Sequence, residues 1–248
     1  MRIPLNHWLR TRPIAHRGLW GGDITENSLS AYKNAANCGF PIEIDLYASK
    51  DGVLYSFHDA DTLRMTGVDG YIYEKTSQEI NALSIGNDQK IPTFDEVLKI
   101  AENKVPLLIE IKNQPNKKIV DMVVDKLKNY NGEFAIQSFN PTYLIRLKKL
   151  APNFLRGILV TLDDKDFGKL SFFKKTILKK MLLNGLFRPD FISIKYTFLP
   201  SVQNKRKKVA LLAWTVTDKF SADNIKPFCD NIIFENFIPA LPQNNWRF

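Results

Sequence analysis

The stretch Pro41-Ile42-Glu43-Ile44-Asp45-Leu46 places two carboxylates, one residue apart, within an otherwise apolar run. A run of this length and composition predicts a buried β-strand, in which side chains at positions i and i+2 point to the same side. Glu43 and Asp45 can therefore offer several oxygens to one hard cation. The run predicts both a strand of a buried sheet and a polar site on that strand.

Seven further short apolar runs follow the same pattern, and helical patterns lie between most of them. The other strands are expected at residues 14–16, 106–111, 133–137, 155–160, 191–195, 209–215 and 231–234. Helices are expected at residues 28–37, 93–103, 117–129, 141–151, 172–183 and 200–206, with a short one from Ser221. Eight such repeats in 248 residues, without a Gly/Ser-rich linker, predict an α/β protein with one domain over residues 1–248. The expected architecture is a TIM (β/α)8 barrel, with a doubly wound open sheet as the alternative.

Two segments interrupt the repeat. The turn Lys50-Asp51-Gly52 returns the chain as an extra strand over residues 53–58, and residues from about 59 to 91 form a small insertion after the second strand. The C-terminal residues 238–248 are too few and too rich in proline for a full eighth helix. We therefore expect the N-terminal residues 5–12 to help cover that side of the barrel.

Polar residues stand at or near the C-terminal ends of different predicted strands, which favours the barrel over the open sheet. They are His16, Glu43, Asp45, Glu110, Lys112, Gln137, Lys195 and Trp214. In a (β/α)8 barrel these ends converge on one mouth, where catalytic residues lie. The pattern therefore predicts one polar site built from several strands.

Glu110 adds a third carboxylate to the pair on the Pro41–Leu46 run. Taken singly, a Glu-x-Asp or Glu-x-Lys pattern is typical of a salt-bridged or exposed strand face. Three carboxylates at strand ends, without a cysteine or paired imidazole ligand, instead indicate one hard divalent cation, Mg²⁺ or Ca²⁺. Glu43, Asp45 and Glu110 are the candidate metal ligands.

Two of the three histidines, His16 and His58, end predicted strands that lead to this mouth. An imidazole titrates near neutral pH, so a pair of them beside a cation suits a general base and a general acid. His16 and His58 are the candidate catalytic residues. His7 lies outside this arrangement, and we expect it at the surface.

Arg17 and Lys112 are the candidate phosphate-binding residues, because a guanidinium and an ammonium both bind non-bridging phosphate oxygens. The alternative is structural pairing with Glu43 or Asp45. Gln137, Phe139, Lys195 and Trp214 form a candidate substrate pocket, whose aromatic side chains could instead serve only to pack the barrel.

The net charge of +9 predicts an anionic partner, and its distribution limits the choice. The cluster Lys205-Arg206-Lys207-Lys208 lacks an aromatic platform, so we expect a solvated loop and no nucleic-acid partner. Residues 172–183 are expected to form a basic outer helix, with an interfacial membrane contact as the alternative.

No apolar stretch approaches the roughly 20 residues of a membrane span, and the start lacks a signal-peptide core, so we expect a cytoplasmic protein. Cys38 and Cys229 are expected to be buried thiols.

Taken together, these motifs resemble those of the glycerophosphodiester phosphodiesterases over most of the chain. The motifs are His16-Arg17-Gly18, Glu26-Asn27-Ser28, Glu43-Ile44-Asp45, Lys50-Asp51-Gly52, His58-Asp59, Leu63-Arg64-Met65-Thr66-Gly67, Ile91-Pro92-Thr93, Glu110-Ile111-Lys112, Gln137-Ser138-Phe139 and Ala213-Trp214-Thr215-Val216. The resemblance implies metal-dependent hydrolysis of a small-molecule glycerophosphodiester to glycerol 3-phosphate and an alcohol. It also implies that His16 deprotonates the attacking hydroxyl and that His58 protonates the leaving alkoxide.

Some residues depart from the family pattern, and other functions remain open. The last strand reads Asn231-Ile232-Ile233-Phe234-Glu235, where the family usually has a Gly-containing stretch followed by Thr-Asp. A lysophospholipase D activity is the nearest alternative, because the Phe- and Leu-rich residues 167–187 could accept an acyl chain. A non-catalytic phosphate-binding barrel and a protein that binds nucleic acid or membranes through its basic clusters are the others. The sequence does not specify an oligomeric state.

Overall fold

The computed structural model describes residues 3–87, 89–163, 176, 181–202, 204, 206 and 208–241. Within these residues, eight parallel strands close into a barrel, because β1 pairs with both β2 and β9. The parallel strands are β1 (Ile14–Ala15), β2 (Ile42–Ala48), β4 (Leu107–Ile111), β5 (Phe134–Ser138), β6 (Arg156–Val160), β7 (Phe191–Lys195), β8 (Ala210–Val216) and β9 (Asn231–Phe234). A ninth strand, β3 (Leu54–Ser56), adds to β2 in antiparallel orientation. The predicted TIM barrel is confirmed, and the open-sheet alternative is wrong.

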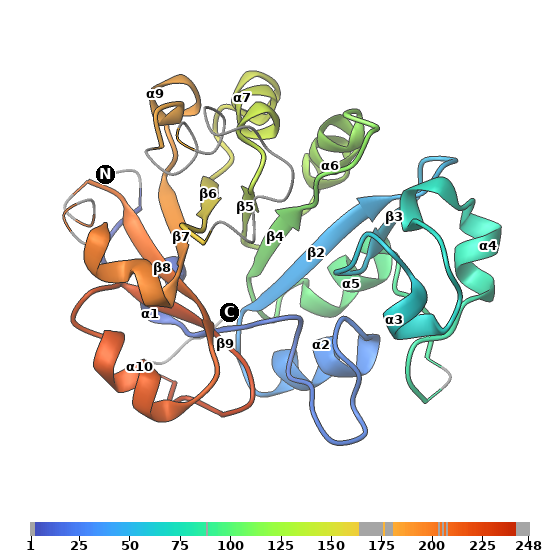
Figure 1. Cartoon of the computed structure of the whole chain (residues 1–248), viewed down its shortest axis with the longest axis horizontal. Coiled ribbons are helices and arrows are strands. Elements are labelled where there is room, and N and C mark those ends of the chain that lie inside the picture. The colour runs from blue at the N-terminus through green and yellow to red at the C-terminus, as the bar shows by residue number, and fades with distance from the viewer. Residues whose placement is uncertain are drawn as a thin grey trace.

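Helices surround the barrel (Figure 1). Those that follow barrel strands are α2 (Leu29–Asn37), α5 (Phe94–Ala101), α6 (Ile119–Leu127), α7 (Pro141–Leu150), α9 (Asn184–Phe187) and α10 (Lys219–Ile225). Local sequence sets several of their starts: the Ser28 hydroxyl accepts the backbone N–H of Ala31, and Thr93 and Glu96 form a capping box. Among the described residues, no helix is long and apolar enough to cross a membrane.

Alternation along β2 separates the two surfaces of the barrel wall. Ile42, Ile44 and Leu46 belong to the main core between the strands and the outer helices, whereas Glu43 and Asp45 point inward. The interior itself changes character along the barrel axis. Its lower part is an apolar cluster of Ile14, Leu108, Ala135, Phe191, Ala210, Leu212 and Ile233. Its upper part, toward the C-terminal ends of the strands, carries the carboxylates.

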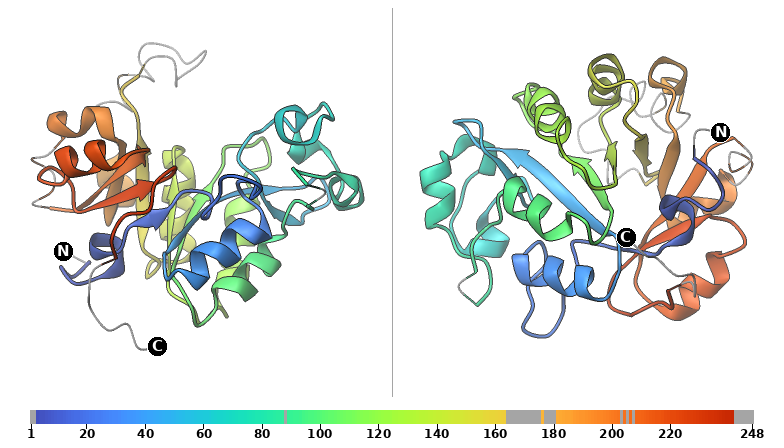
Figure 2. Two further views of the ribbon diagram at one scale, coloured as in Figure 1. Left: turned by 90° about the horizontal axis from the view of Figure 1, so that it is seen from below. Right: turned by 180° about the vertical axis from the view of Figure 1, so that it is seen from behind.

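From the sequence we expected the N-terminal residues 5–12 to help cover the side of the barrel. In the structure this segment closes the lower end of the barrel instead. Helix α1 (Trp8–Thr11) contacts β8 and β9, and Trp8 and Leu9 join the apolar interior cluster (Figure 2). Both side chains are at most 2% exposed. Burial of these two large apolar side chains removes their surface from water and so stabilises this position of the segment. His7 is not a free surface residue, because its Nδ1 accepts the backbone N–H of Leu9 and caps α1.

The insertion after β3 contains α3 (Leu63–Thr66), the 3-10 helix η1 (Ile72–Glu74) and α4 (Ser77–Ala82). It projects from one side of the barrel beside β2 and β3 (Figure 1). A separate apolar cluster holds it there: Tyr47, Tyr55, Phe57, Ile72, Ile80, Leu83, Ile85 and Ile91. The insertion is therefore packed on the barrel and is not an independent lobe.

Two further expectations differ from the structure. The helix expected to begin at Pro200 is not what the structure shows there: Pro200 lies inside the 3-10 helix η3 (Tyr196–Ser201), which starts directly after β7, and proline lacks the N–H that an α-helix needs. Residues 203 and 205 of the expected range 200–206 lie outside the described residues. Cys38 is exposed, whereas Cys229 is buried as expected. Of the basic helix expected over 172–183, residues 172–175 and 177–180 lie outside the described residues, and residues 181–183 form turns. Of the cluster at 205–208, Lys205 and Lys207 also lie outside them, and Arg206 pairs with Asp230 at 3.0 Å.

The inward position of Gly157 on β6 allows a stability test. A Cβ atom there would lie 2.1 Å from Cε2 of Phe191, whose ring is fully buried in the lower interior cluster. We expect Gly157→Ala to lower the free energy of unfolding by about 1–3 kcal/mol, because the packed ring must shift. Gly185→Ala, with nothing within 4 Å of the added carbon, is the control and should be neutral or slightly stabilising. Urea denaturation measures both, and equal stability of the two variants would contradict the packing argument.

Candidate active site

Three carboxylates meet at the mouth of the barrel. Asp45 on β2 and Glu110 on β4 are register partners on adjacent parallel strands, and Glu43 stands two residues before Asp45. One oxygen from each of the three lies within 4.8 Å of the other two, and all three side chains are buried. Hard oxygen donors at this spacing fit a Mg²⁺ or Ca²⁺ ion. The structure therefore brings the three predicted metal ligands together.

The loop after β1 places Arg17 against this cluster. Gly18 has a φ of +86°, and a Cβ atom there would lie 2.7 Å from the carbonyl carbon of Ala31 on α2, so only glycine fits. Arg17 itself has a φ of +59°, which is uncommon for a residue with a side chain. This conformation turns its backbone N–H toward Glu43, whose Oε2 accepts it at 3.3 Å. Such strained backbone is typical of functional loops.

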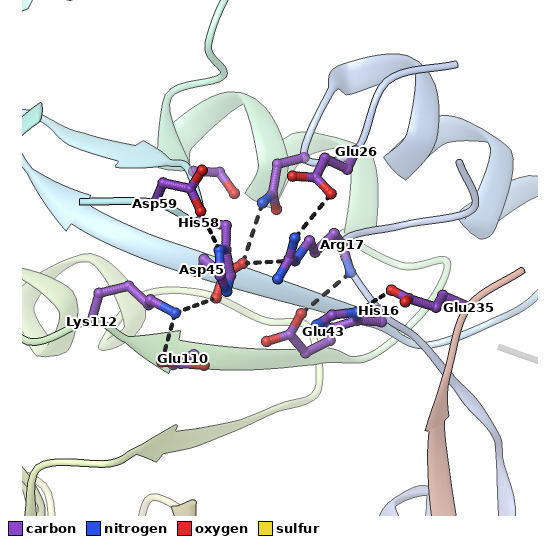
Figure 3. A network of polar contacts seen from close by, with 12 residues as sticks. His16, Arg17, Glu26, Glu43, Asp45, His58, Asp59, Glu110, Lys112 and Glu235 are labelled. Atoms are coloured by element: carbon purple, nitrogen blue, oxygen red, sulfur yellow. Dashed lines mark hydrogen bonds and ion pairs between the residues drawn. The ribbon is translucent and has the colours of Figure 1, made fainter. Parts of the chain in front are cut away.

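Two cations neutralise part of the buried negative charge (Figure 3). The Lys112 ammonium lies 3.2 Å from Oδ1 of Asp45 and 3.0 Å from Oε1 of Glu110. The Arg17 guanidinium lies 3.7 Å from Oδ2 of Asp45 through Nε, and its Nη1 donates to Oε2 of Glu26 at 2.9 Å. The structural pairing that the sequence left open is thus present for both cations. Their phosphate-binding role stays a prediction.

Burial and mutual repulsion set the pKa values of the three carboxyl groups. Burial, and then the charge of Asp45, raise the pKa of Glu43 well above its usual range. Burial also raises the pKa of Glu110, despite the nearby Lys112. Burial acts in the same direction on Asp45, but Lys112, His58, Arg17 and His16 outweigh it and hold its pKa below the usual range. A divalent cation would relieve this repulsion, so the site's electrostatics also fit a metal.

Each of the two histidines is oriented by a carboxylate. His16 follows β1, and its Nδ1 lies 2.6 Å from Oε2 of Glu235, the residue after β9. His58 follows β3, and its Nδ1 lies 2.7 Å from Oδ1 of Asp59. An ionised carboxylate can only accept, so each Nδ1 carries the proton and each Nε2 is left for chemistry.

The pKa values of the two partners support this assignment. The hydrogen bond from His58 holds the pKa of Asp59 far below its usual range. Burial raises the pKa of Glu235, but the hydrogen bond and charge of His16 outweigh burial and lower it. Both carboxyl groups are therefore ionised at neutral pH and remain acceptors for the imidazoles.

The four candidate pocket residues lie on β5, β7 and β8 or, in the case of Phe139, directly after β5. Gln137 is buried beside Glu110 in the β4–β5 register, and its Oε1 accepts a hydrogen bond from Ser193 at 2.7 Å. The rings of Phe139 and Trp214 meet edge to face with centroids 5.6 Å apart. Lys195, the register partner of Trp214, lies 3.5 Å from Asp163. These side chains contact one another or their neighbours, and their substrate role stays a prediction.

Several site residues were not assigned a role from the sequence. Asn27 donates to Oδ2 of Asp45 at 3.2 Å and accepts from Tyr32 at 2.7 Å, which ties α2 to the carboxylates. Glu26 and Asp59 lie in motifs that were recognised without a function, and their contacts with Arg17 and His58 supply one. Glu235 stood out only as a departure from the family pattern. Its position after a barrel strand was the signal that could have marked it as a partner for the site.

The sequence profile of the glycerophosphoryl diester phosphodiesterase family matches residues 16–233. A glycerophosphodiester phosphodiesterase of Caldanaerobacter subterraneus is 34% identical over 166 residues, which cover 61% of this chain and 67% of that protein. A lysophospholipase D of Homo sapiens is 29% identical over 149 residues, covering 54% of this chain and 46% of that protein. A solved phosphodiesterase of Oleispira antarctica, in complex with the product sn-glycerol-3-phosphate, has a TM-score of 0.75 at 25% identity, covering 90% of this chain and 92% of that one.

The barrel, the acidic mouth and these relatives together define an enzyme, a phosphoric diester hydrolase. The chain belongs to the glycerophosphoryl diester phosphodiesterase family. The family predicted from the sequence motifs is therefore confirmed.

Metal binding to the three carboxylates can be measured without turnover. A ligand that binds only the folded state at about 100 times its Kd adds about 2.7 kcal/mol of stability, so Mg²⁺ or Ca²⁺ should raise the melting temperature of the wild-type protein. We expect Glu43→Ala and Glu110→Ala to fold but to lose most of this shift. Asp125→Ala removes an exposed carboxylate whose ion pair among the described residues is with Lys128, and this variant should keep the shift. An unchanged shift in Glu110→Ala would exclude that residue as a ligand.

Proposed function

We propose that this protein hydrolyses glycerophosphodiesters to glycerol 3-phosphate and an alcohol at the mouth of its barrel. The observation that carries the proposal is the meeting of three buried carboxylates with two imidazoles whose Nδ1 atoms each contact a carboxylate. The product-bound relative from Oleispira antarctica supports the substrate class. Glu43, Asp45 and Glu110 would hold one divalent cation, Mg²⁺ or Ca²⁺, which when bound polarises a phosphoryl oxygen and offsets its developing charge.

The two histidines divide the proton transfers. Nε2 of His16 accepts the proton of the attacking hydroxyl, which belongs either to water or to the glycerol 2-hydroxyl, the latter giving a cyclic phosphate that water then opens. The bond between phosphorus and the alcohol oxygen breaks, and His58, which enters this step as the imidazolium with both nitrogens protonated, donates its Nε2 proton to the departing alkoxide and is left as the neutral Nδ1–H tautomer. Glu235 and Asp59 hold the two rings in the required tautomers and stabilise them when protonated.

Arg17 and Lys112 bind the phosphate in this proposal. Nε of Arg17 lies 3.7 Å from Oδ2 of Asp45 and makes no hydrogen bond to a described residue, which leaves its N–H uncommitted. Lys112 stays protonated because Asp45 and Glu110 raise its pKa despite its burial. It therefore adds a fixed positive charge to the site.

Gln137, Phe139, Lys195 and Trp214 would form walls for the alcohol in this proposal. The exposed face of Phe139, which is 38% exposed, and the ring of Trp214 offer apolar surface for an organic leaving group. Lysophospholipase D activity is the second candidate, and the similarity to a human lysophospholipase D favours it. Residues 164–175 and 177–180, which bear on an acyl-chain site, lie outside the described residues.

A substrate panel tests the reaction and its metal requirement together. We expect glycerophosphocholine and glycerophosphoethanolamine to yield glycerol 3-phosphate, chelation to abolish turnover, and Mg²⁺ or Ca²⁺ to restore it. Lysophosphatidylcholine in the same panel distinguishes the second candidate. Full activity in excess EDTA after dialysis would rule out the metal, and cleavage of lysophospholipids alone would replace the first substrate class by the second.

The roles of the two histidines are tested by changing the leaving group. General-acid assistance contributes about 10² to 10⁴ in rate for a poor leaving group and little for a good one. We expect His58→Ala to be severely slowed on glycerophosphocholine but nearly normal on glycerol 3-phosphate p-nitrophenyl ester, and His16→Ala to be slow on both. The exchange of these two behaviours would reverse the assignment. Equal losses on both substrates in both variants would show that neither imidazole is a specific acid or base.

A further inference from the structure

Arg64 belongs to the motif Leu63-Arg64-Met65-Thr66-Gly67, which has no part in the reaction described above. It lies on α3 of the insertion, and its side chain is 52% exposed. Its guanidinium nevertheless contacts two carboxylates of the mouth. Nε donates to Oδ2 of Asp59, in the loop after β3, and Nη2 donates to Oε1 of Glu26, in the loop between β1 and α2.

Each of these carboxylates uses its second oxygen on a residue of the proposed site (Figure 3). Oδ1 of Asp59 accepts from Nδ1 of His58 at 2.7 Å, and Oε2 of Glu26 accepts from Nη1 of Arg17 at 2.9 Å. The five side chains therefore form one alternating series of acceptors and donors. Arg64 stands at its centre, between the proposed general acid and the proposed phosphate ligand.

We propose that Arg64 is a positioning residue that fixes the proposed general acid His58 and the proposed phosphate-binding Arg17 at once; this inference rests on the proposed function. It holds Asp59 in the rotamer that orients His58, and Glu26 in the rotamer that orients Arg17. A guanidinium suits this task because its planar fork presents donors in two directions. A lysine ammonium is a single point charge on a flexible stem and would not hold both carboxylates in these geometries.

Stability alone does not account for this arrangement. Ion pairs of half-exposed side chains contribute little to folding, because solvent and salt screen them. The chain contains a similar pair in Arg146 of α7 and Asp121 of α6, where the Arg146 side chain is 47% exposed. That pair joins two outer helices and serves as the matched control for losing an exposed arginine.

The test compares Arg64→Gln with Arg146→Gln on glycerophosphocholine and on the p-nitrophenyl ester. We expect Arg64→Gln to lower kcat about 10- to 100-fold on glycerophosphocholine, a size typical of lost supporting hydrogen bonds, and to leave kcat on the nitrophenyl ester nearly unchanged. KM should rise several-fold on both substrates, because Arg17 loses its orientation. Arg146→Gln should match the wild-type protein, and Arg64→Lys should not restore the lost kcat.

Two further variants separate the two contacts of Arg64. Asp59→Asn should reproduce the loss of kcat on glycerophosphocholine, and Glu26→Gln should reproduce the rise in KM. If Arg64→Gln matches Arg146→Gln, the proposal is overturned. The same holds if Arg64→Gln loses an equal factor on both substrates with KM unchanged, as a smaller folded fraction would cause.

A spectroscopic measurement keeps this test independent of the proposed function. The chain has only three histidines, so ¹⁵N NMR of the imidazoles can assign His58 by comparison with His58→Ala. For the neutral form of His58, we expect the Nδ1-protonated tautomer in the wild-type protein and a mixture of tautomers in Arg64→Gln. Identical His58 signals in the two proteins would overturn the positioning role. Failure of the wild-type protein to cleave glycerophosphocholine would count against the proposed function. The comparison of the His58 signals would still decide whether Arg64 positions His58.

Discussion

The burial of three carboxylates in one small volume is the constraint on which the rest of the site depends. Isolated charges are costly to remove from water, and like charges close together add repulsion to that cost. Two positive charges and one hydrogen-bond donor offset this cost, because Lys112, Arg17 and the Asn27 amide all contact Asp45. Glu43 and Glu110, with raised pKa values, remain the least compensated members. The cluster can therefore take up additional positive charge, and the cations that offset its charge, Lys112 and Arg17, are the residues proposed to bind the phosphate.

The barrel and the strand-borne part of the site could be predicted from sequence because both depend on local patterns. The runs at 191–195 and 231–234 coincide with β7 and β9, and the alternation in Pro41–Leu46 put Glu43 and Asp45 on the inner face. Capping residues such as Thr93 marked where helices begin. These signals follow from backbone geometry, so one sequence is enough to read them.

The remaining features depend on contacts between distant parts of the chain. Glu235 meets His16 across 219 positions, and Arg64 meets Glu26 across 38, so no periodicity indicates either pair. Trp8 and Leu9 lie in a short amphipathic segment, whose destination depends on the space left under the strands. The start of η3 also depends on tertiary structure. We expected a helix to begin at Pro200, but the 3-10 helix begins at Tyr196, directly after β7. Tertiary packing decides such cases over local preference.

The barrel closes through the short strand β1, and we call its pairings with β2 and β9 the seam of the barrel. Strand β1 shares a single register pair with β2 and two with β9, whereas β2 and β4 share five. This seam also lies beside the proposed site, because the backbone N–H of His16 donates to the carbonyl of Phe234. Asn231, in the strand that departs from the family pattern, fastens the segment before β1 by donating to the carbonyls of Leu9 and Arg12 at 3.2 and 2.6 Å. The contacts that close the barrel between β1 and β9 therefore also set the positions of His16 and Arg17, so local opening at this joint would move both residues relative to the acidic cluster.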